Sequence, residues 1–245
     1  MTKTIAQGYQ DTQDRIRAAC EEAGRDPQDV SLMVVTKFHP VETVAELVRL
    51  GVRNFGENRE QEARQKAQQL LELDAEEGVL QGKAAEWSMI GQLQSNKCNA
   101  VSRWAHSVHS VDSQKLVRRL GNGVRRALDE GSRTDSKLGI FLQVSIDDDI
   151  ARGGTSEDEV FRLADQTSDD PNLQLRGLMS VPPLDSDPDK CFGYLQQLSQ
   201  QLQENHPEAN EISAGMTSDL EAAIRHGSTC VRVGTAILGP RPQQH

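Results

Sequence analysis

The sequence has no long apolar run, no excess of basic residues and no secretory signal. No apolar stretch in its 245 residues approaches the roughly 20 residues that a membrane-spanning helix needs. The 37 Asp and Glu outnumber the 27 Lys and Arg, which gives a formal net charge of -10. Because phosphates attract basic surfaces, neither a general nucleic-acid-binding protein nor a membrane-surface protein is expected. A local basic pocket for one small anion is still compatible with this charge.

The sequence also lacks the patterns typical of metal and redox sites. Its four cysteines are scattered without a Cys-x-x-Cys pair. His106 and His109 are three apart on a predicted strand, so their side chains point to opposite faces and cannot share a metal. The first residues, 1–7, contain no apolar core before a small-residue cleavage site. We therefore expect a cytoplasmic protein without a metal centre.

Short β-branched apolar runs alternate with segments of helical periodicity. The predicted strands are 32–36, 52–55, 87–90, 107–111, 140–144, 175–179, 211–213 and 230–233. The predicted helices are 5–23, 41–50, 59–73, 96–104, 113–128, 156–166, 187–202 and 218–226. Serines stand where N-caps belong at 113, 156 and 218, and glycines follow predicted helices at 51, 131 and 227.

Eight strands that alternate with helices, after one extra N-terminal helix, predict an α/β fold with a single (β/α)8 TIM barrel. The length agrees, since this fold typically uses about 250 residues. No change in composition marks a linker, so residues 1–245 are predicted to form one domain. A doubly wound open sheet is the alternative, because strand count alone does not prove closure.

In both folds the active site lies at the C-terminal ends of the strands, where unusual residues should be sought. Lys37 follows the apolar run that ends at Thr36. Partial burial in a barrel mouth would favour its neutral amine, which is a nucleophile toward aldehydes. Taken alone, Lys37 could equally be an ordinary lysine that reaches solvent.

The last two strands are followed by residues suited to an anion. Ser213 leads through Gly215 into a predicted helix start, and Gly234 and Thr235 follow the final strand. Free backbone N–H groups and hydroxyls at helix starts bind anions, and barrels often bind phosphate after strands seven and eight. These positions predict a phosphate-bearing small ligand that faces Lys37.

Seven segments in order carry a resemblance to a known family. They include Val-Thr-Lys at 35–37, Phe-Gly-Glu-Asn at 55–58, Ile-Gly-Gln-Leu-Gln-Ser-Asn-Lys at 90–97, and the segments 109–113, 177–179, 215–224 and 231–237. Together they resemble the YggS/PROSC family of pyridoxal 5′-phosphate (PLP) homeostasis proteins. The resemblance covers nearly the whole chain. It implies the barrel of the alanine racemase N-terminal domain, the type III fold of PLP enzymes.

The resemblance implies PLP as cofactor, held covalently as a Schiff base on Lys37. The other implied contacts are Asn58 near the ring, Ser213, Gly234 and Thr235 at the phosphate, Gly215, Met216 and Thr217 beside them, and Arg232 at the pyridine nitrogen. A guanidinium does not give up its proton, so a nitrogen beside it stays unprotonated. The cofactor is then a poorer electron sink than one paired with an aspartate. The alternative for Arg232 is an ion pair with a carboxylate across the barrel.

Four positions depart from the pattern that the family usually shows. His39 stands where a second lysine or arginine is common, and Arg59 where a tyrosine often follows Gly-Glu-Asn. Ala214 replaces a frequent methionine, and Arg152 replaces a lysine. Transfer of PLP from Lys37 to a lysine at position 39 is therefore not available.

The resemblance implies a PLP carrier or regulator without established turnover, so no catalytic residue is assigned. Its partners would be PLP and PLP-dependent apo-enzymes. A PLP-dependent amino-acid racemase with one-base chemistry is the alternative, since the racemases' second domain is not recognised here and Tyr9 and Tyr194 lie in predicted helices. Without that domain's dimer contact, a monomer is expected. A phosphosugar enzyme would need Glu57 as general base.

Overall fold

The strands of the computed structural model close into one barrel, as predicted. The structure describes residues 3–146, 153–183 and 185–240. Within these ranges eight strands are ordered β1 to β8, each parallel to the next, and β8 pairs back with β1. They are β1 Ser31–Val35, β2 Asn54–Glu57, β3 Glu86–Met89, β4 Ser107–Val111, β5 Leu138–Gln143, β6 Leu173–Met179, β7 Glu211–Ser213 and β8 Cys230–Val233. The doubly wound alternative is wrong, because an open sheet has no pairing between its first and last strands.

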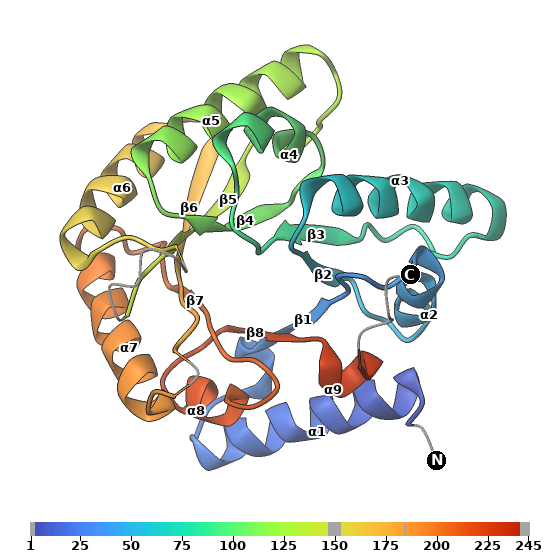
Figure 1. Ribbon diagram of the computed structural model, residues 1–245, viewed down its shortest axis with the longest axis horizontal. Coiled ribbons are helices and arrows are strands. Elements are labelled where there is room, and N and C mark those ends of the chain that lie inside the picture. Colours follow the sequence, from blue (N-terminus) through green and yellow to red (C-terminus); the bar gives the residue numbers. More distant parts are fainter. Residues whose placement is uncertain (1–2, 147–152, 184, 241–245) are drawn as a thin grey trace.

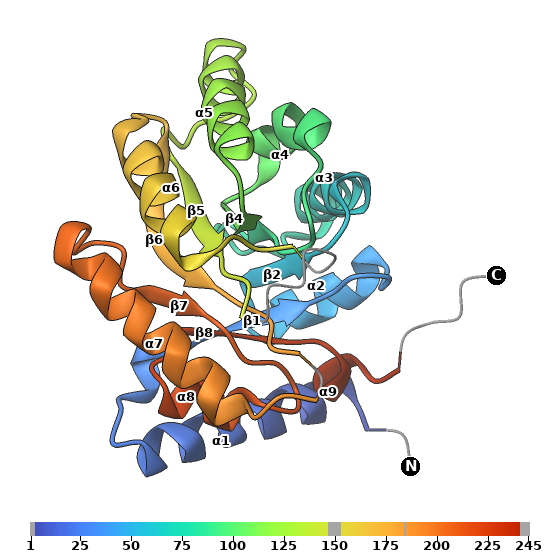
Figure 2. The same cartoon turned by 60° about the vertical axis from the view of Figure 1, so that its left-hand side comes forward.

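Helices surround the barrel, which Figure 1 views end-on. They are α1 Ile5–Glu22, α2 Val41–Arg49, α3 Glu60–Glu77, α4 Cys98–Trp104, α5 Gln114–Asp129, α6 Glu157–Asp169, α7 Pro188–Asn205, α8 Leu220–Arg225 and α9 Thr235–Leu238, with 3-10 turns η1 Pro27–Asp29 and η2 Ser95–Lys97. The predicted N-terminal helix is α1, which lies beside α8 and α9 in Figures 1 and 2. Among the described helices, none is long and apolar enough to cross a membrane.

Some predicted ends of helices and strands differ from the observed ones, and one short helix was not predicted. Helix α3 continues through residues 74–77, past its predicted end at residue 73, and is followed by Gly78 with a left-handed φ of 64°. Strand β2 begins at Asn54, two residues later than predicted. Helix α8 is capped by Asp219 rather than Ser218. Helix α9 was not predicted, because four residues are too few to show a helical period.

Alternation along the strands separates an apolar outer face from a polar interior. Val34, Phe55 and Val231 are buried in the cluster that also contains Val44 and Leu47 of α2. The residues between them face inward: a Cβ on Gly56 would lie 2.8 Å from Met33 Sδ. Because side chains alternate, Val35 shares the inward face of Met33, and Lys37 follows two residues later, past the end of β1, and lines the same cavity as Val35. Helix packing thus directs Lys37 into the barrel mouth.

Candidate functional site

A cavity of about 430 Å³ opens at the C-terminal end of the barrel. Strands β1, β2, β3 and β8 border it, together with the segments that follow β6 and β7. Its lining residues are Val35, Lys37, His39, Asn58, Ile90, Val181, Met216, Thr217, Ser218, Arg232, Gly234, Thr235 and Gly239. The volume lies in the range usual for small-molecule sites.

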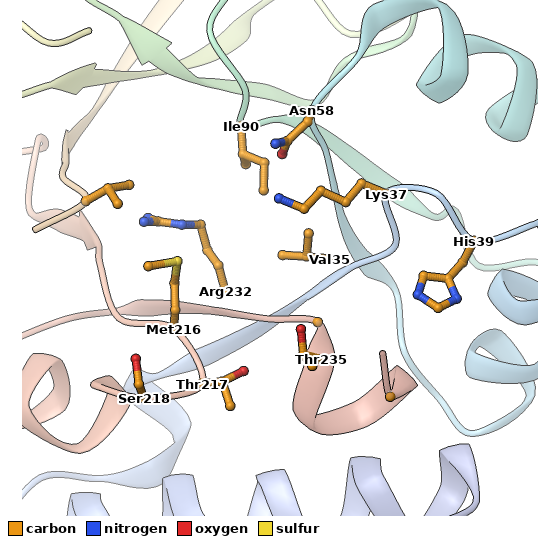
Figure 3. A pocket seen from close by; sticks show the side chains of 13 residues that line it. Val35, Lys37, His39, Asn58, Ile90, Met216, Thr217, Ser218, Arg232 and Thr235 are labelled. Atoms are coloured by element: carbon orange, nitrogen blue, oxygen red, sulfur yellow. The ribbon is translucent and has the colours of Figure 1, made fainter. Parts of the chain in front are cut away.

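Two cationic side chains enter this cavity from neighbouring strands. Lys37 follows β1 and Arg232 belongs to β8, and the two strands pair with Met33 opposite Arg232. Figure 3 shows both side chains pointing into the cavity, with Asn58 from the end of β2 close to the lysine. The sequence-predicted pair therefore meets as expected.

Arg232 is held rigidly by neutral acceptors. Its Nη1 donates to the Ser213 carbonyl at 2.5 Å and to Ser213 Oγ at 2.6 Å, and its Nη2 donates to the Ser180 carbonyl at 3.0 Å. The side chain is buried, and burial lowers the pKa of its guanidinium from the ordinary value. In the described part of the chain Arg232 has no carboxylate within ion-pair distance. The alternative of an ion pair across the barrel is wrong for these residues.

The cavity is cationic although the chain is acidic. Among its described lining residues there is no Asp or Glu, whereas Lys37 and Arg232 supply positive charge. Thr217, Ser218 and Thr235 add hydroxyl groups along one side, where Figure 3 shows them below Met216 and Arg232. Asp219 Oδ1 accepts the Met216 backbone N–H at 2.6 Å and so fixes the turn before α8. This set of donors suits a small anion.

Two of the predicted contact residues do not line the cavity. Ser213 is fully buried, and its hydroxyl contacts Arg232 and His109 inside the barrel. Gly215 has φ 92°, and a Cβ there would lie 2.6 Å from the Ala223 Cβ, so it allows the close packing of α8. Both residues lie beside the site rather than on its surface. The other seven predicted residues line the cavity.

The loop that carries Lys37 rests on a buried ion cluster. Lys66 Nζ of α3 donates to Glu57 Oε1 and to the Thr36 carbonyl, each at 2.7 Å, and lies 2.8 Å from Glu62 Oε1. Glu57 also accepts the Thr36 hydroxyl at 2.6 Å, and burial raises its pKa. Glu62 accepts the backbone N–H of Phe38 at 2.5 Å. The residues on both sides of Lys37 are thereby fixed.

The same cluster excludes the phosphosugar alternative. Glu57 is completely buried on the helix side of β2 and does not line the cavity, so it cannot act there as a general base. Tyr9 and Tyr194 lie in α1 and α7 and do not line the cavity either.

Lys97 lines a separate cavity that shares Asn58 with this one, and its Nζ lies 4.0 Å from Glu60 Oε2.

Two of the four departures from the family pattern, His39 and Arg59, lie around the Lys37 loop. His39 lines the cavity at its edge (Figure 3), and burial followed by the nearby Lys66 charge lowers its pKa. The Arg59 guanidinium lies over the Phe38 ring, 5.2 Å from its centroid. Ala214 is buried in the core. Arg152 lies outside the described residues.

Sequence reasoning did not single out several lining residues. Val35 could have been found from alternation within the predicted strand 32–36, since it lies two residues before Lys37. Ser218 belongs to the helix start that the sequence predicts to bind an anion, but it was not named as a contact residue, and it lines the cavity. Ile90 and Val181 carry no local signal, because only barrel closure brings them to this mouth.

The described residues hold no metal-binding cluster. No group of three or more His, Cys, Asp or Glu there could bind a metal ion. The four cysteines are buried and unpaired, as expected of small hydrophobic residues.

Known proteins match nearly the whole chain. The family model for the alanine racemase N-terminal domain matches residues 10–242. A Corynebacterium glutamicum protein named pyridoxal phosphate homeostasis protein is 49% identical over 230 residues, which are 94% of this chain and 99% of that protein. The chain belongs to the pyridoxal phosphate homeostasis protein family. The sequence-based resemblance to this family is thus confirmed.

Two solved structures place the family fold in context. PipY of Synechococcus elongatus, solved with PLP bound, is 30% identical with a TM-score of 0.75, over 91% of this chain and 100% of PipY. Alanine racemase of Corynebacterium glutamicum is 15% identical with a TM-score of 0.63, over 95% of this chain and 62% of the racemase chain. The second similarity shows the fold alone. The barrel of the homeostasis protein family is therefore that of the racemase N-terminal domain.

Proposed function

We propose that this chain binds pyridoxal 5′-phosphate in the barrel-mouth cavity and acts in PLP homeostasis. The observation that carries the proposal is a cavity of about 430 Å³ in which Lys37 and Arg232 enter from adjacent strands and no described carboxylate takes part. PLP is a small phosphorylated aldehyde, so it needs an amine and an anion site together. The relative with PLP bound and the relatives named for PLP homeostasis support the same function.

The lining residues fit the parts of PLP. When bound, PLP supplies an aldehyde that condenses with an amine with loss of one water, and Lys37 Nζ is the amine that lines the cavity. Thr217, Gly234 and Thr235 would hold the phosphate by hydroxyl and backbone contacts. Arg232 would face the pyridine nitrogen, with Asn58 beside the ring. Each contact to the charged phosphate is expected to contribute about 1.5 to 3 kcal/mol.

Ser213, Gly215 and Met216 support this arrangement in different ways. Met216 lines the cavity directly. We assign Ser213 to the buried side of the site, because its hydroxyl already contacts Arg232 and His109. Gly215 is needed for the turn into α8. Their removal should weaken PLP binding through the positions of Arg232 and the 216–218 turn.

We further propose that the protein carries or regulates PLP without turnover. The names of its relatives support a homeostasis role. A racemase with two bases would need a second acid–base group, and neither tyrosine lines the described cavity. We propose PLP-dependent apo-enzymes as recipients and a single-domain monomer as the working form. The cytoplasmic location stays a prediction.

The proposal is tested by titrating the purified protein with PLP and following the visible absorption of the bound form. We expect saturable binding near one PLP per chain, and loss of that absorption in Lys37→Met. The matched control is Lys97→Met, which changes a half-exposed lysine outside the cavity. Equal loss in both variants, or unchanged absorption in Lys37→Met, would refute the assignment of the cavity.

A further inference from the structure

A chain of buried hydrogen bonds crosses the barrel beneath the cavity. Ser88 Oγ lies 2.8 Å from Ser107 Oγ, which lies 2.9 Å from His109 Nε2. His109 Nδ1 lies 2.8 Å from Ser213 Oγ, which accepts Arg232 Nη1 at 2.6 Å. All five side chains are buried. Strands β3, β4, β7 and β8 are thereby connected to the arginine of the cavity.

The arginine end gives this chain a direction. A guanidinium only donates, so Ser213 Oγ must accept from Arg232 and its own proton is left for another acceptor. His109 Nδ1 lies within reach and accepts this proton when it carries none of its own. A neutral imidazole with a bare Nδ1 carries its proton on Nε2, which then donates to Ser107. Ser107 in turn donates to Ser88, whose hydroxyl ends the chain.

The opposite direction leaves one proton poorly placed. If His109 carried its proton on Nδ1, Ser213 Oγ would receive two donors, and its own proton would turn to the Cys230 thiol, which pairs with Ser213 between β7 and β8. Sulfur is a weak acceptor in comparison with an imidazole nitrogen. The direction that starts at Arg232 avoids this weak contact and leaves its last proton on Ser88, at the end of the chain away from the arginine.

The surroundings of His109 also disfavour a second proton on the ring. The imidazole is 1% exposed and stacks on Phe141 with ring centroids 4.1 Å apart. The charged groups facing it are Arg232 and Arg176, and Glu211 already pairs with Arg176. Burial first and these cations second hold the pKa of His109 well below its ordinary value. A neutral ring can accept from Ser213, and a doubly protonated ring cannot.

We propose that His109 is a positioning residue for the cofactor site. In its neutral Nε2–H form, His109 accepts the Ser213 proton and thereby fixes Arg232. His109 touches no cavity atom, because Ser213 lies between it and the arginine. The expected effect of His109 on PLP binding rests on the proposed function, whereas the inference about its tautomer does not. Without this contact the direction of the Ser213 hydroxyl is no longer fixed, and only the Ser213 and Ser180 carbonyls hold Arg232 in place.

The first test is the tautomer itself, measured by ¹⁵N NMR on the protein without PLP. His109 is recognised among the six histidines by its contacts to the Phe141 ring. We expect a pyridine-type Nδ1 and a pyrrole-type Nε2 that do not change between pH 8 and pH 6. A pyrrole-type Nδ1, or a doubly protonated ring in this range, would overturn the proposal whatever the protein binds.

The second test compares two substitutions that differ in acceptor capacity. His109→Asn keeps an amide oxygen near the Nδ1 position, whereas His109→Phe fills the space without an acceptor. We expect PLP to dissociate about tenfold faster from His109→Phe and nearly as in wild type from His109→Asn. Equal rates in both variants would contradict the positioning role. Failure of wild type to bind PLP would refute the proposed function and leave the NMR result to decide the tautomer.

Discussion

At the scale of single residues, the site depends on side chains that do not line the cavity themselves. Lys37 has no regular structure to fix it, because the strand ends at Val35. The residues on either side of it are fixed by Lys66, Glu57 and Glu62 from β2 and α3. A buried ion cluster costs desolvation, and it is retained here where the chain must leave a strand with a defined direction.

Removal of the buried cation should therefore be costly. Lys66→Met leaves Glu57 and Glu62 without their common partner, and we expect a loss of about 3 to 5 kcal/mol in the free energy of unfolding. Urea unfolding measures this change. The control is Lys83→Met at an exposed lysine, which should change stability by less than about 0.5 kcal/mol. Similar losses in the two variants would show that the cluster does not stabilise the loop.

His109 should give the stability of the protein a definite pH dependence. Its pKa is well below 6.5 in the folded chain and near 6.5 when unfolded, so below pH 6.5 the unfolded state binds the extra proton. Its contribution is complete above pH 6.5 and decreases as the pH falls. Between pH 7.5 and 5.5 we expect wild type to lose about 1.4 kcal/mol more than His109→Asn in urea unfolding. An identical loss in the two proteins would contradict a neutral buried imidazole.

At the scale of elements, the approach of α1 to α9 supports the turn that follows β8. A Cβ on Gly8 of α1 would lie 2.5 Å from the Ile237 carbonyl oxygen, so the two helices touch through this glycine. Helix α9 begins at Thr235, directly after Gly234. The extra N-terminal helix thus packs behind two residues that we assign to the phosphate.

Two helical glycines should respond to substitution with opposite signs. Gly8→Ala should lower the free energy of unfolding by about 1 to 3 kcal/mol, because backbone atoms of Ile237 must move. Gly193→Ala on α7 should raise it by about 0.5 to 1 kcal/mol, because the new methyl meets only the His226 ring at 3.6 Å and helical glycine is unfavourable. Thermal unfolding of both variants gives the signs. Stabilisation by Gly8→Ala would show that α1 does not touch α9 this closely.

The sequence predicted the order of elements because strand and helix periods are local properties. Its errors lie at the ends of elements and in short elements, as in the four residues added to α3 before Gly78 and the four residues of α9. For the site, position after a strand was enough to find Lys37, Gly234 and Thr235, whereas the role of Arg232 came from the family resemblance. It was not enough for Ser213, because only the closed barrel brings His109 of β4 next to β7.

At the scale of the whole molecule, the acidic chain contains a cationic cavity. The chain has a formal net charge of -10, yet the cavity contains lysine and arginine without a described carboxylate. An anion that enters this mouth replaces the solvent around two positive groups. One is Arg232, which neutral acceptors hold in place, and the other is Lys37, which lies on the loop after β1. The barrel supplies the walls, and the segments after β7 and β8 supply hydroxyl groups.

The central claim is that Lys37 in this mouth is the residue to which PLP is attached. Borohydride reduction of the PLP-loaded protein, followed by peptide mapping, tests it most directly. We expect a single stable phosphopyridoxyl adduct on Lys37. An adduct confined to another lysine, or no adduct on a protein that retains PLP, would contradict it.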